Sequence, residues 1–188
     1  MVTAEARVQR GPFTNEPFVD FSKPEIRKAM EEALKKVKSE FGRDYPLWIE
    51  GERIETADKL RSYNPSHPDE VVGIFSKANA ELADRAVEAA YRAFERWKRV
   101  PAEQRAECLF RAADILRKRK FEMMAWIVYE VGKTWPEADG DVAETIDHCE
   151  FYGRDIMRFT GPQRLFPMAG EKNYGLYIPL GEIGRAHV

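Results

Sequence analysis

Helical patterning dominates this chain and leaves little sequence from which to build a sheet. Apolar residues recur at helical spacing almost continuously from residue 79 to about residue 160. Strand signals are few and short: a hairpin at 47–54, an apolar run at 71–75 and a candidate strand at 174–180. Three or four short strands cannot cover the inner faces of so many helices. We therefore expect an α/β chain whose helices either pack mostly on one another or cover strands that lie outside this sequence.

Start and stop signals predict helices over residues 24–41, 79–97 and 136–158, and a helix from about residue 101 that either continues or restarts through 123–131. We expect capping side chains at Ser22, Asn79 and Thr134, and glycine stops at Gly42 and Gly132. The predicted buried stripe of the second helix is Ala83, Ala86, Val87, Ala90, Phe94 and Trp97. The first twenty residues show no periodicity and are interpreted as an extended arm, ordered only if it docks.

Composition narrows the class of protein. Thirty Lys and Arg residues against 32 Asp and Glu give a net charge of −2, which argues against disorder and against a nucleic-acid partner. No apolar run approaches the roughly 18 residues of a membrane span, and the N-terminus lacks the apolar stretch of a signal peptide. The two cysteines have no paired spacing and fit a reducing compartment. The expectation is a soluble protein of the cytoplasm with no membrane partner.

The residues alone assemble no catalytic, cofactor-binding or metal site. Cys108 and Cys149 fall within helices and are predicted to be core residues rather than nucleophiles. Asp141, Glu144 and His148 share one helical face, and Glu144 with His148 has the spacing of half a metal site. No second helix offers a matching pair, so a solvated or cleft-facing polar stripe with an ion pair along the helix is the favoured interpretation.

Two further patterns carry no chemistry. The run Arg117-Lys118-Arg119-Lys120 is short, lies within a predicted helix and has acidic neighbours, so it is interpreted as a solvated helix face rather than a nucleic-acid patch. Neither GxGxxG nor GxxxxGK[ST] occurs, which removes the common phosphate-binding loops.

The order and spacing of several segments nevertheless resembles a known family. From about Tyr45 to Gly181 the chain is similar to the N-terminal third of NAD(P)-dependent aldehyde dehydrogenases. The segments that carry this similarity are, in chain order, Asn64-Pro65 after a hairpin, VVGIFSKAN, AVEAAYRAFERW, Arg105 with LFRAADILR, and YEVGKTWPEADGDVAE. Within that family, FTNEP at 13–17, FGRDYPLWIEG at 41–51 and DVAETID at 141–147 are similar to the L-glutamate γ-semialdehyde (1-pyrroline-5-carboxylate) dehydrogenases of proline catabolism.

This resemblance implies a fold and its division. Residues 1–44 are expected to form the arm and an amphipathic helix. Residues 45–181 are expected to form the helix-rich, incomplete N-terminal part of a Rossmann-like cofactor-binding domain, with the start of the oligomerisation strands. Residues 182–188, EIGRAHV, depart from the family, and DNA encoding them resembles the start of a sequencing-library adapter. We expect these seven residues to be a non-native tail and leave them out of the fold.

The resemblance also implies a function. The parent enzyme would oxidise L-glutamate 5-semialdehyde to L-glutamate with NAD in the cytoplasm, as a homo-oligomer. Its cysteine nucleophile, general base and nucleotide-binding residues would follow Gly181, so the 188-residue chain is expected to be inactive. Glu144 matches the family's substrate-binding glutamate, which bonds the amino group of the semialdehyde, although the neighbouring Asp147-His148-Cys149 departs from the aromatic and apolar pattern expected there. The alternatives are another NAD(P)-dependent semialdehyde dehydrogenase, or a non-catalytic helical interaction module.

Overall fold

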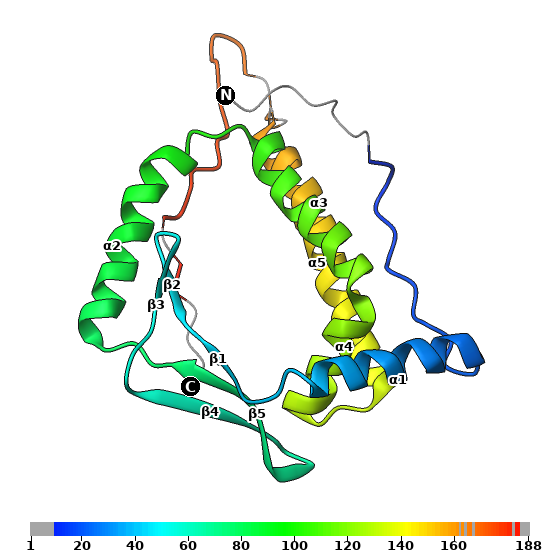
Figure 1. The fold of residues 1–188 in the computed structure, drawn as a ribbon. Coiled ribbons are helices and arrows are strands. Elements are labelled where there is room, and N and C mark those ends of the chain that lie inside the picture. The colour runs from blue at the N-terminus through cyan, green and yellow to red at the C-terminus, as the bar shows by residue number, and fades with distance from the viewer. Residues whose placement is uncertain (1–9, 162, 164, 167, 182, 185–188) are drawn as a thin grey trace.

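Helices and short strands follow one another around an open ring (Figure 1). The computed structural model describes residues 10–161, 163, 165–166, 168–181 and 183–184. Within these residues the elements are α1 (Pro24–Lys38), β1 (Arg43–Tyr45), β2 (Leu47–Ile49), β3 (Glu52–Ile54), β4 (Lys59–Asn64), β5 (His67–Ser76), α2 (Ala80–Trp97), α3 (Ala102–Lys118), α4 (Lys120–Val131) and α5 (Trp135–Thr160). In Figure 1, α2 forms one side of the ring and the pair α3 and α5 the other, while α1, α4, β4 and β5 close it below.

The strands form two small sheets. β5 lies at the centre of a three-stranded sheet, parallel to β1 and antiparallel to β4, and β2 pairs with β3 as a hairpin. The hairpin turns through Glu50 and Gly51, both with positive φ, which suits the right-handed twist of the flanking strands. The predicted hairpin and central strand are confirmed. β1 and β4 escaped prediction because their sequences, RDY and KLRSYN, carry no apolar alternation.

Most of the predicted helix ends are confirmed by their backbone contacts. The Asn79 side chain accepts a hydrogen bond from the Leu82 N–H at 2.9 Å. Thr134 and Glu137 form a capping box, in which Glu137 accepts from the Thr134 N–H at 2.9 Å. Gly132 ends α4 in the left-handed conformation, with φ of 75°. Such local signals specify a helix terminus without help from distant residues.

Other details of the predicted helices are wrong. The Ser22 hydroxyl donates to the Asp20 carboxylate at 2.6 Å instead of capping α1, and no side chain takes its place. α1 ends at Lys38, earlier than the predicted Phe41. Residues 101–132, by contrast, form two helices, α3 and α4, which meet at Arg119, so the restart that was one of the two predicted possibilities is confirmed.

The helical core lies where α1, α4 and α5 meet, with α3 packed along α5. Its fully or nearly buried members are Met30, Val37, Ala113, Met124, Ala125, Ala138, Val142 and Ile146. The apolar side predicted for the last helix is therefore confirmed in this region. Cys149 packs against the same core, as predicted.

Gly153 of α5 permits the close approach of α3, and its replacement is expected to be destabilising. A Cβ at this position would lie 2.6 Å from Cε1 of the buried Phe110 ring. The guanidinium groups of Arg10 and Arg154 lie 4.7 and 5.4 Å from the centre of that ring, so the ring cannot easily move away from an added Cβ. We expect Gly153→Ala to lower the free energy of unfolding by about 1–3 kcal/mol through overpacking, despite the higher helix propensity of alanine.

Denaturant titration of the variant chain measures this effect. Gly140→Ala in the same helix is the matched control, because an added Cβ there meets no atom within 4 Å. The control is expected to be as stable as the parent chain or slightly more stable. Equal stabilities for the two variants would contradict the close packing at Gly153.

Two predictions of burial and one prediction of a strand are wrong. No residue of α2 is buried, and Val87 and Trp97 of its predicted stripe are 63% and 47% exposed. Residues 174–180 form no strand, and Leu176, for example, is 83% exposed. Cys108 is exposed on α3. Of these, α2 and residues 174–180 share one physical reason: the described residues provide little against which they can pack. The face of α3 that is buried is instead formed by Ala102, Ala106, Phe110 and Ala113.

The predicted division into residues 1–44, 45–181 and 182–188 stays a prediction. Residues 1–9 of the predicted arm lie outside the described residues, and of the predicted tail at 182–188 only 183–184 are described. The α/β class and the excess of helix over strand are confirmed.

Candidate functional site

The extended arm docks along α5, the helix that carries Glu144, the substrate-binding residue predicted from the resemblance. The Asp147 carboxylate accepts from the Asn15 side chain and from the Glu16 N–H, both at 2.7 Å. Farther along the arm, the Val19 N–H donates to Asp139 at 2.8 Å. The arm therefore runs antiparallel to α5. The prediction that its order comes from docking is confirmed for the described residues.

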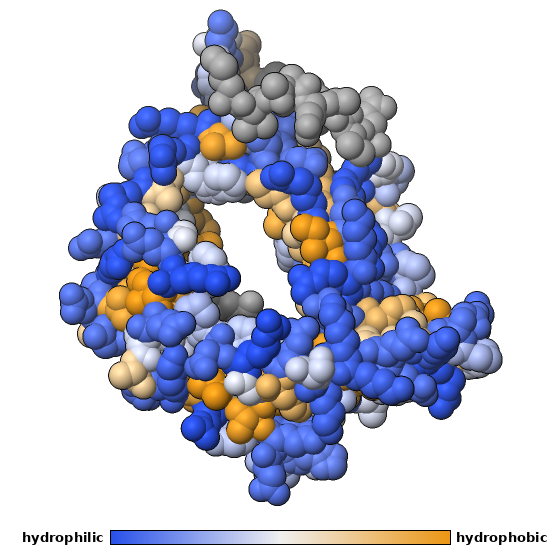
Figure 2. Space-filling model, in the orientation of Figure 1, coloured by the Kyte–Doolittle hydropathy of each residue, from blue (hydrophilic) through white to orange (hydrophobic). Residues whose placement is uncertain are grey.

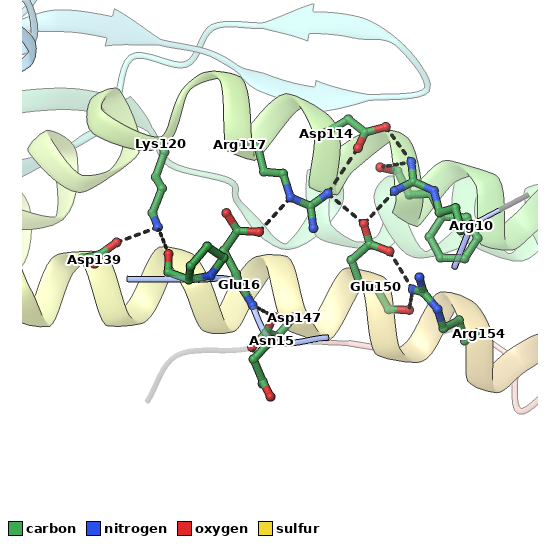
Figure 3. A network of polar contacts seen from close by, with 12 residues as sticks. Arg10, Asn15, Glu16, Asp114, Arg117, Lys120, Asp139, Asp147, Glu150 and Arg154 are labelled. Atoms are coloured by element: carbon green, nitrogen blue, oxygen red, sulfur yellow. Dashed lines mark hydrogen bonds and ion pairs between the residues drawn. The ribbon is translucent and has the colours of Figure 1, made fainter. Parts of the chain in front are cut away.

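A buried carboxylate, Glu150, fastens the arm at Arg10, its first described residue (Figure 3). Its oxygens accept hydrogen bonds from Arg10 at 2.7 Å, Arg117 at 2.8 Å and Arg154 at 2.6 Å. Burial alone would raise the pKa of Glu150, but the hydrogen bonds from Arg154 and Arg117 and the charge of Arg10 hold that pKa below its usual value. Glu150 therefore remains a carboxylate and ties α3, α5 and the arm together.

A second buried pair fastens the end of the arm. Lys120 Nζ lies 2.8 Å from Asp139 Oδ1 and donates to the Pro17 carbonyl at 3.0 Å. Both side chains are almost fully buried, 8% and 2% exposed. Figure 3 shows this pair and the Glu150 cluster on either side of Glu16.

The prediction of a solvated basic face is accordingly wrong for half of the run at 117–120. Arg117 bonds Glu16 at 2.8 Å as well as Glu150, and Lys120 is buried. Lys118 and Arg119 are exposed, as predicted. The spacing of the four residues cannot reveal this division, because Arg117 and Lys120 bond residues that are distant in the sequence: Glu16 and Pro17 on the arm, and Glu150 and Asp139 on α5.

Acid should weaken the fold, since the carboxylates of Glu150, Asp114 and Glu122 have a lowered pKa; Glu122 pairs with Arg119 and with Lys36 of α1. The hydrogen bond from Arg119 outweighs burial and, with the bond from Lys36, lowers the pKa of Glu122 to about 2. The pKa of Asp114 is lowered by its hydrogen bond from Arg10. A carboxylate whose pKa is lower in the folded chain than in the unfolded chain stabilises the fold above the unfolded value, roughly 4.3 for glutamate, and loses that contribution as the pH falls.

We therefore expect the free energy of unfolding to fall continuously between about pH 5 and pH 2, the window set by the ordinary and the lowered pKa values. Urea titrations at a series of pH values measure this slope. Glu122→Gln should reduce it, because the group that binds a proton on unfolding is gone. A stability that stays constant from pH 5 to pH 3 would contradict the role of these carboxylates.

Glu144 lies on the exposed face of α5, three residues before Asp147 and thus close to the docked arm. Its side chain forms no hydrogen bond or ion pair with any residue that the structure describes. The other two members of the polar stripe have neighbours: Asp141 pairs with Lys133 at 2.5 Å, and the His148 ring lies 5.7 Å from that of Tyr152. The substrate-binding role of Glu144 stays a prediction.

The described residues offer little support for a metal site or for a cysteine nucleophile. Within that part of the chain, no three His, Cys, Asp or Glu side chains lie close enough together to hold a metal ion. Burial raises the pKa of the Cys149 thiol, which disfavours a thiolate. The exposed Cys108 thiol donates to the Gln104 carbonyl within its own helix, at 3.5 Å.

Among the described helices, none combines the length and the apolar character needed to cross a membrane.

Comparison with known proteins identifies the class of protein. The model of the aldehyde dehydrogenase family matches residues 48–185, which is most of the chain. This chain belongs to the aldehyde dehydrogenase family.

Individual relatives narrow the comparison. The chain is 51% identical over 170 residues to the 1-pyrroline-5-carboxylate dehydrogenase of Geobacillus kaustophilus, covering 90% of this chain and 33% of that protein. It is 46% identical to 1-pyrroline-5-carboxylate dehydrogenase 1 of Halalkalibacterium halodurans over the same length. A solved structure of 1-pyrroline-5-carboxylate dehydrogenase from Thermus with bound NAD is 48% identical, with a TM-score of 0.86 over 92% of this chain and 34% of that one.

The chain thus spans about a third of the length of the curated relatives that it matches. The predicted family and fold class are confirmed. About two thirds of the relatives' length has no counterpart in this chain.

Proposed function

We propose that this chain is the N-terminal third of an enzyme that oxidises L-glutamate 5-semialdehyde, the open form of 1-pyrroline-5-carboxylate, to L-glutamate with NAD. The observation that carries the proposal is the identity of 46–51% to proteins named for this activity, over 90% of the chain. The Thermus relative with bound NAD supports the choice of cofactor. We further propose that the complete enzyme is a homo-oligomer of the cytoplasm.

The described residues fit a role in holding substrate rather than cofactor. The sequence holds no glycine-rich loop of the kind that binds the phosphates of a nucleotide. Glu144 presents an exposed carboxylate on α5, and a carboxylate is a good acceptor for the ammonium group of an amino-acid semialdehyde. The arm fixes α5 through Asp139, Asp147 and Glu150, on both sides of Glu144. Glu144 therefore lies on a helix that the arm holds in place, and not on a loop.

A chimeric enzyme tests the proposal. Residues 1–181 would be joined to the part of the G. kaustophilus relative that follows its matched stretch, and NADH formation would be measured with several aldehydes. We expect the chimera to prefer glutamate 5-semialdehyde over shorter semialdehydes and over simple aliphatic aldehydes. A preference for a shorter semialdehyde would favour the alternative of another semialdehyde dehydrogenase.

The 188-residue chain on its own is expected to form no NADH from any aldehyde, because burial raises the pKa of the Cys149 thiol and the Cys108 thiol donates to a carbonyl of its own helix instead of to a general base. Turnover above the buffer rate by the purified chain would contradict this.

A further inference from the structure

The proposed substrate carries two opposite charges at one end, and Glu144 accounts for only one of them. In glutamate 5-semialdehyde an ammonium group and a carboxylate group are attached to the same carbon atom. The Glu144 carboxylate can accept hydrogen bonds from the ammonium group, whereas the substrate carboxylate needs a donor. The neighbouring side chains of Asp141 and Asp147 are acidic as well and offer none. A site for the whole head group therefore needs a donor close to Glu144.

Most of the donors described around this part of α5 already have partners. The Asn15 side chain donates to the Asp147 carboxylate at 2.7 Å. The Thr145 hydroxyl donates to the Asp141 carbonyl at 2.8 Å, and Lys133 Nζ lies 2.5 Å from the Asp141 carboxylate. None of these three groups is free to serve a substrate without giving up a contact within the chain.

His148 is the donor that remains among these described neighbours. It follows Glu144 by four residues, so the two side chains share one face of α5, about 6 Å apart along the helix axis. Neither ring nitrogen forms a hydrogen bond with any residue that the structure describes. A histidine ring carries at least one N–H in either protonation state. The Tyr152 hydroxyl is eight residues from Glu144, about 12 Å along the axis, which is too far to share one head group with it.

The His148 ring is held by an aromatic cluster that reaches the arm. Its centre lies 5.7 Å from that of the Tyr152 ring, which in turn lies 5.5 Å from the Phe151 ring. Phe151 meets Phe13 of the arm edge to face, with ring centres 5.6 Å apart. Contacts of this kind restrict the orientation of a ring. The N–H of His148 is therefore presented by a supported side chain.

A small molecule can reach this face of α5. Glu144 and His148 are both exposed. Figure 2 shows that the ring of helices and strands is open through its middle, and Figure 1 places the pair of α3 and α5 along one edge of the opening. The carboxylate and the ring N–H are thus available to a ligand in the described structure.

We propose that His148 donates a ring N–H to the carboxylate of glutamate 5-semialdehyde while Glu144 accepts hydrogen bonds from its ammonium group. The inference rests on the proposed function and on the predicted role of Glu144, and it adds the residue that recognises the second charge. It gives the spacing of Glu144 and His148 a use that needs no metal ion. His148 is then the residue that selects an amino-acid aldehyde over an aldehyde with an ammonium group alone.

Three aldehydes separate the two charges in the chimeric enzyme that contains residues 1–181. 4-Aminobutanal is glutamate 5-semialdehyde without the carboxylate, and 5-oxopentanoate is the same molecule without the ammonium group. His148→Phe keeps an aromatic ring but removes both nitrogens. We expect it to reduce kcat/KM, measured by NADH formation, roughly tenfold for the two aldehydes that carry a carboxylate. The value for 4-aminobutanal should stay within about twofold of that of the parent chimera.

Three further variants complete the test. His148→Gln keeps an N–H donor at a similar reach, so it should retain kcat/KM for the carboxylate-bearing aldehydes within about threefold. Glu144→Gln should show the complementary pattern, with losses for the two aldehydes that carry an ammonium group. His67→Phe makes the same exchange at an exposed histidine of β5 and should leave all three constants unchanged.

Each outcome has a consequence. The inference is overturned if His148→Phe lowers kcat/KM equally for all three aldehydes, which would assign the ring to the support of α5, or if it lowers none of them. The proposed function survives either result as long as the chimera prefers glutamate 5-semialdehyde. A chimera that oxidises 5-oxopentanoate best, and loses this preference in His148→Phe, supports carboxylate binding by His148 and contradicts the proposed function instead.

Discussion

Replacing Lys120 by methionine is expected to lower the free energy of unfolding by about 3–5 kcal/mol, the typical cost of removing one partner of a buried ion pair. Methionine keeps most of the volume of the side chain but not its charge. The Asp139 side chain is only 2% exposed, and among the described residues its charge would then be compensated only by the hydrogen bond from the Val19 N–H. The Pro17 carbonyl would lose its donor as well. The expected result is a less stable chain with a loosened arm, measured by urea unfolding and by limited proteolysis near residue 17.

The basic run itself contains the matched control. Lys118→Met changes a lysine two residues away that is exposed, and it is expected to alter the stability by no more than about 0.5 kcal/mol. In the double variant Lys120→Met with Asp139→Leu, neither charge remains buried, so much of the lost stability should return. If Lys120→Met costs no more than Lys118→Met, the pair does not hold the arm.

The comparison of these two lysines shows where sequence reasoning succeeds and where it stops. Asn79, Gly132 and Thr134 were correctly predicted as helix ends, because a cap is satisfied by backbone groups only a few residues away. Lys118 and Lys120 carry the same charge in the same run. Only the fold, which brings Pro17 and Asp139 to one of them, distinguishes a buried lysine from a solvated one.

Burial could be predicted where its partner elements lie within this chain. The apolar side of α5 meets α1 and α4, so Val142 and Ile146 are buried as their spacing indicates. The stripe of α2 follows the same rule of spacing, yet Val87 is exposed. Periodicity reports which face of a helix is suited to burial, and it does not report whether the covering element is present. For the same reason the apolar residues at 174–180 do not form a strand without a neighbouring strand to supply hydrogen bonds.

In the candidate site, too, some features could be predicted from the sequence and others are shown only by the fold. The residue pattern places Glu144 in a polar stripe with the spacing of half a metal site, and only the family resemblance assigns it a substrate-binding role. The residues that hold its helix, Asp139, Asp147 and Glu150, were absent from the prediction. Their spacing of 8 and 3 residues along α5 resembles an ordinary polar face, and only the docked arm shows that Asp139 and Glu150 are buried.

Replacing Glu144 by alanine in the chimeric enzyme is expected to reduce kcat/KM for glutamate 5-semialdehyde roughly ten- to hundredfold. This corresponds to the loss of about 1.5–3 kcal/mol for a hydrogen bond to a charged group. The loss should be confined to substrates with an ammonium group. An aliphatic aldehyde of similar length has no group for the Glu144 carboxylate to bind, so its kcat/KM should change little. The ratio of the two constants, measured by NADH formation, is therefore the diagnostic quantity.

Two further variants separate the charge of Glu144 from its place in the helix. Glu144→Gln keeps the shape of the side chain and one acceptor oxygen but removes the charge, so it should lose selectivity nearly as strongly as alanine does. Thr145→Ala changes an exposed neighbour on α5 and should leave the ratio unaltered. Equal losses for both aldehydes in Glu144→Ala would assign the residue to the support of α5. No loss with either aldehyde would make it a surface acid, and the substrate assignment would then depend on the identity to the relatives alone.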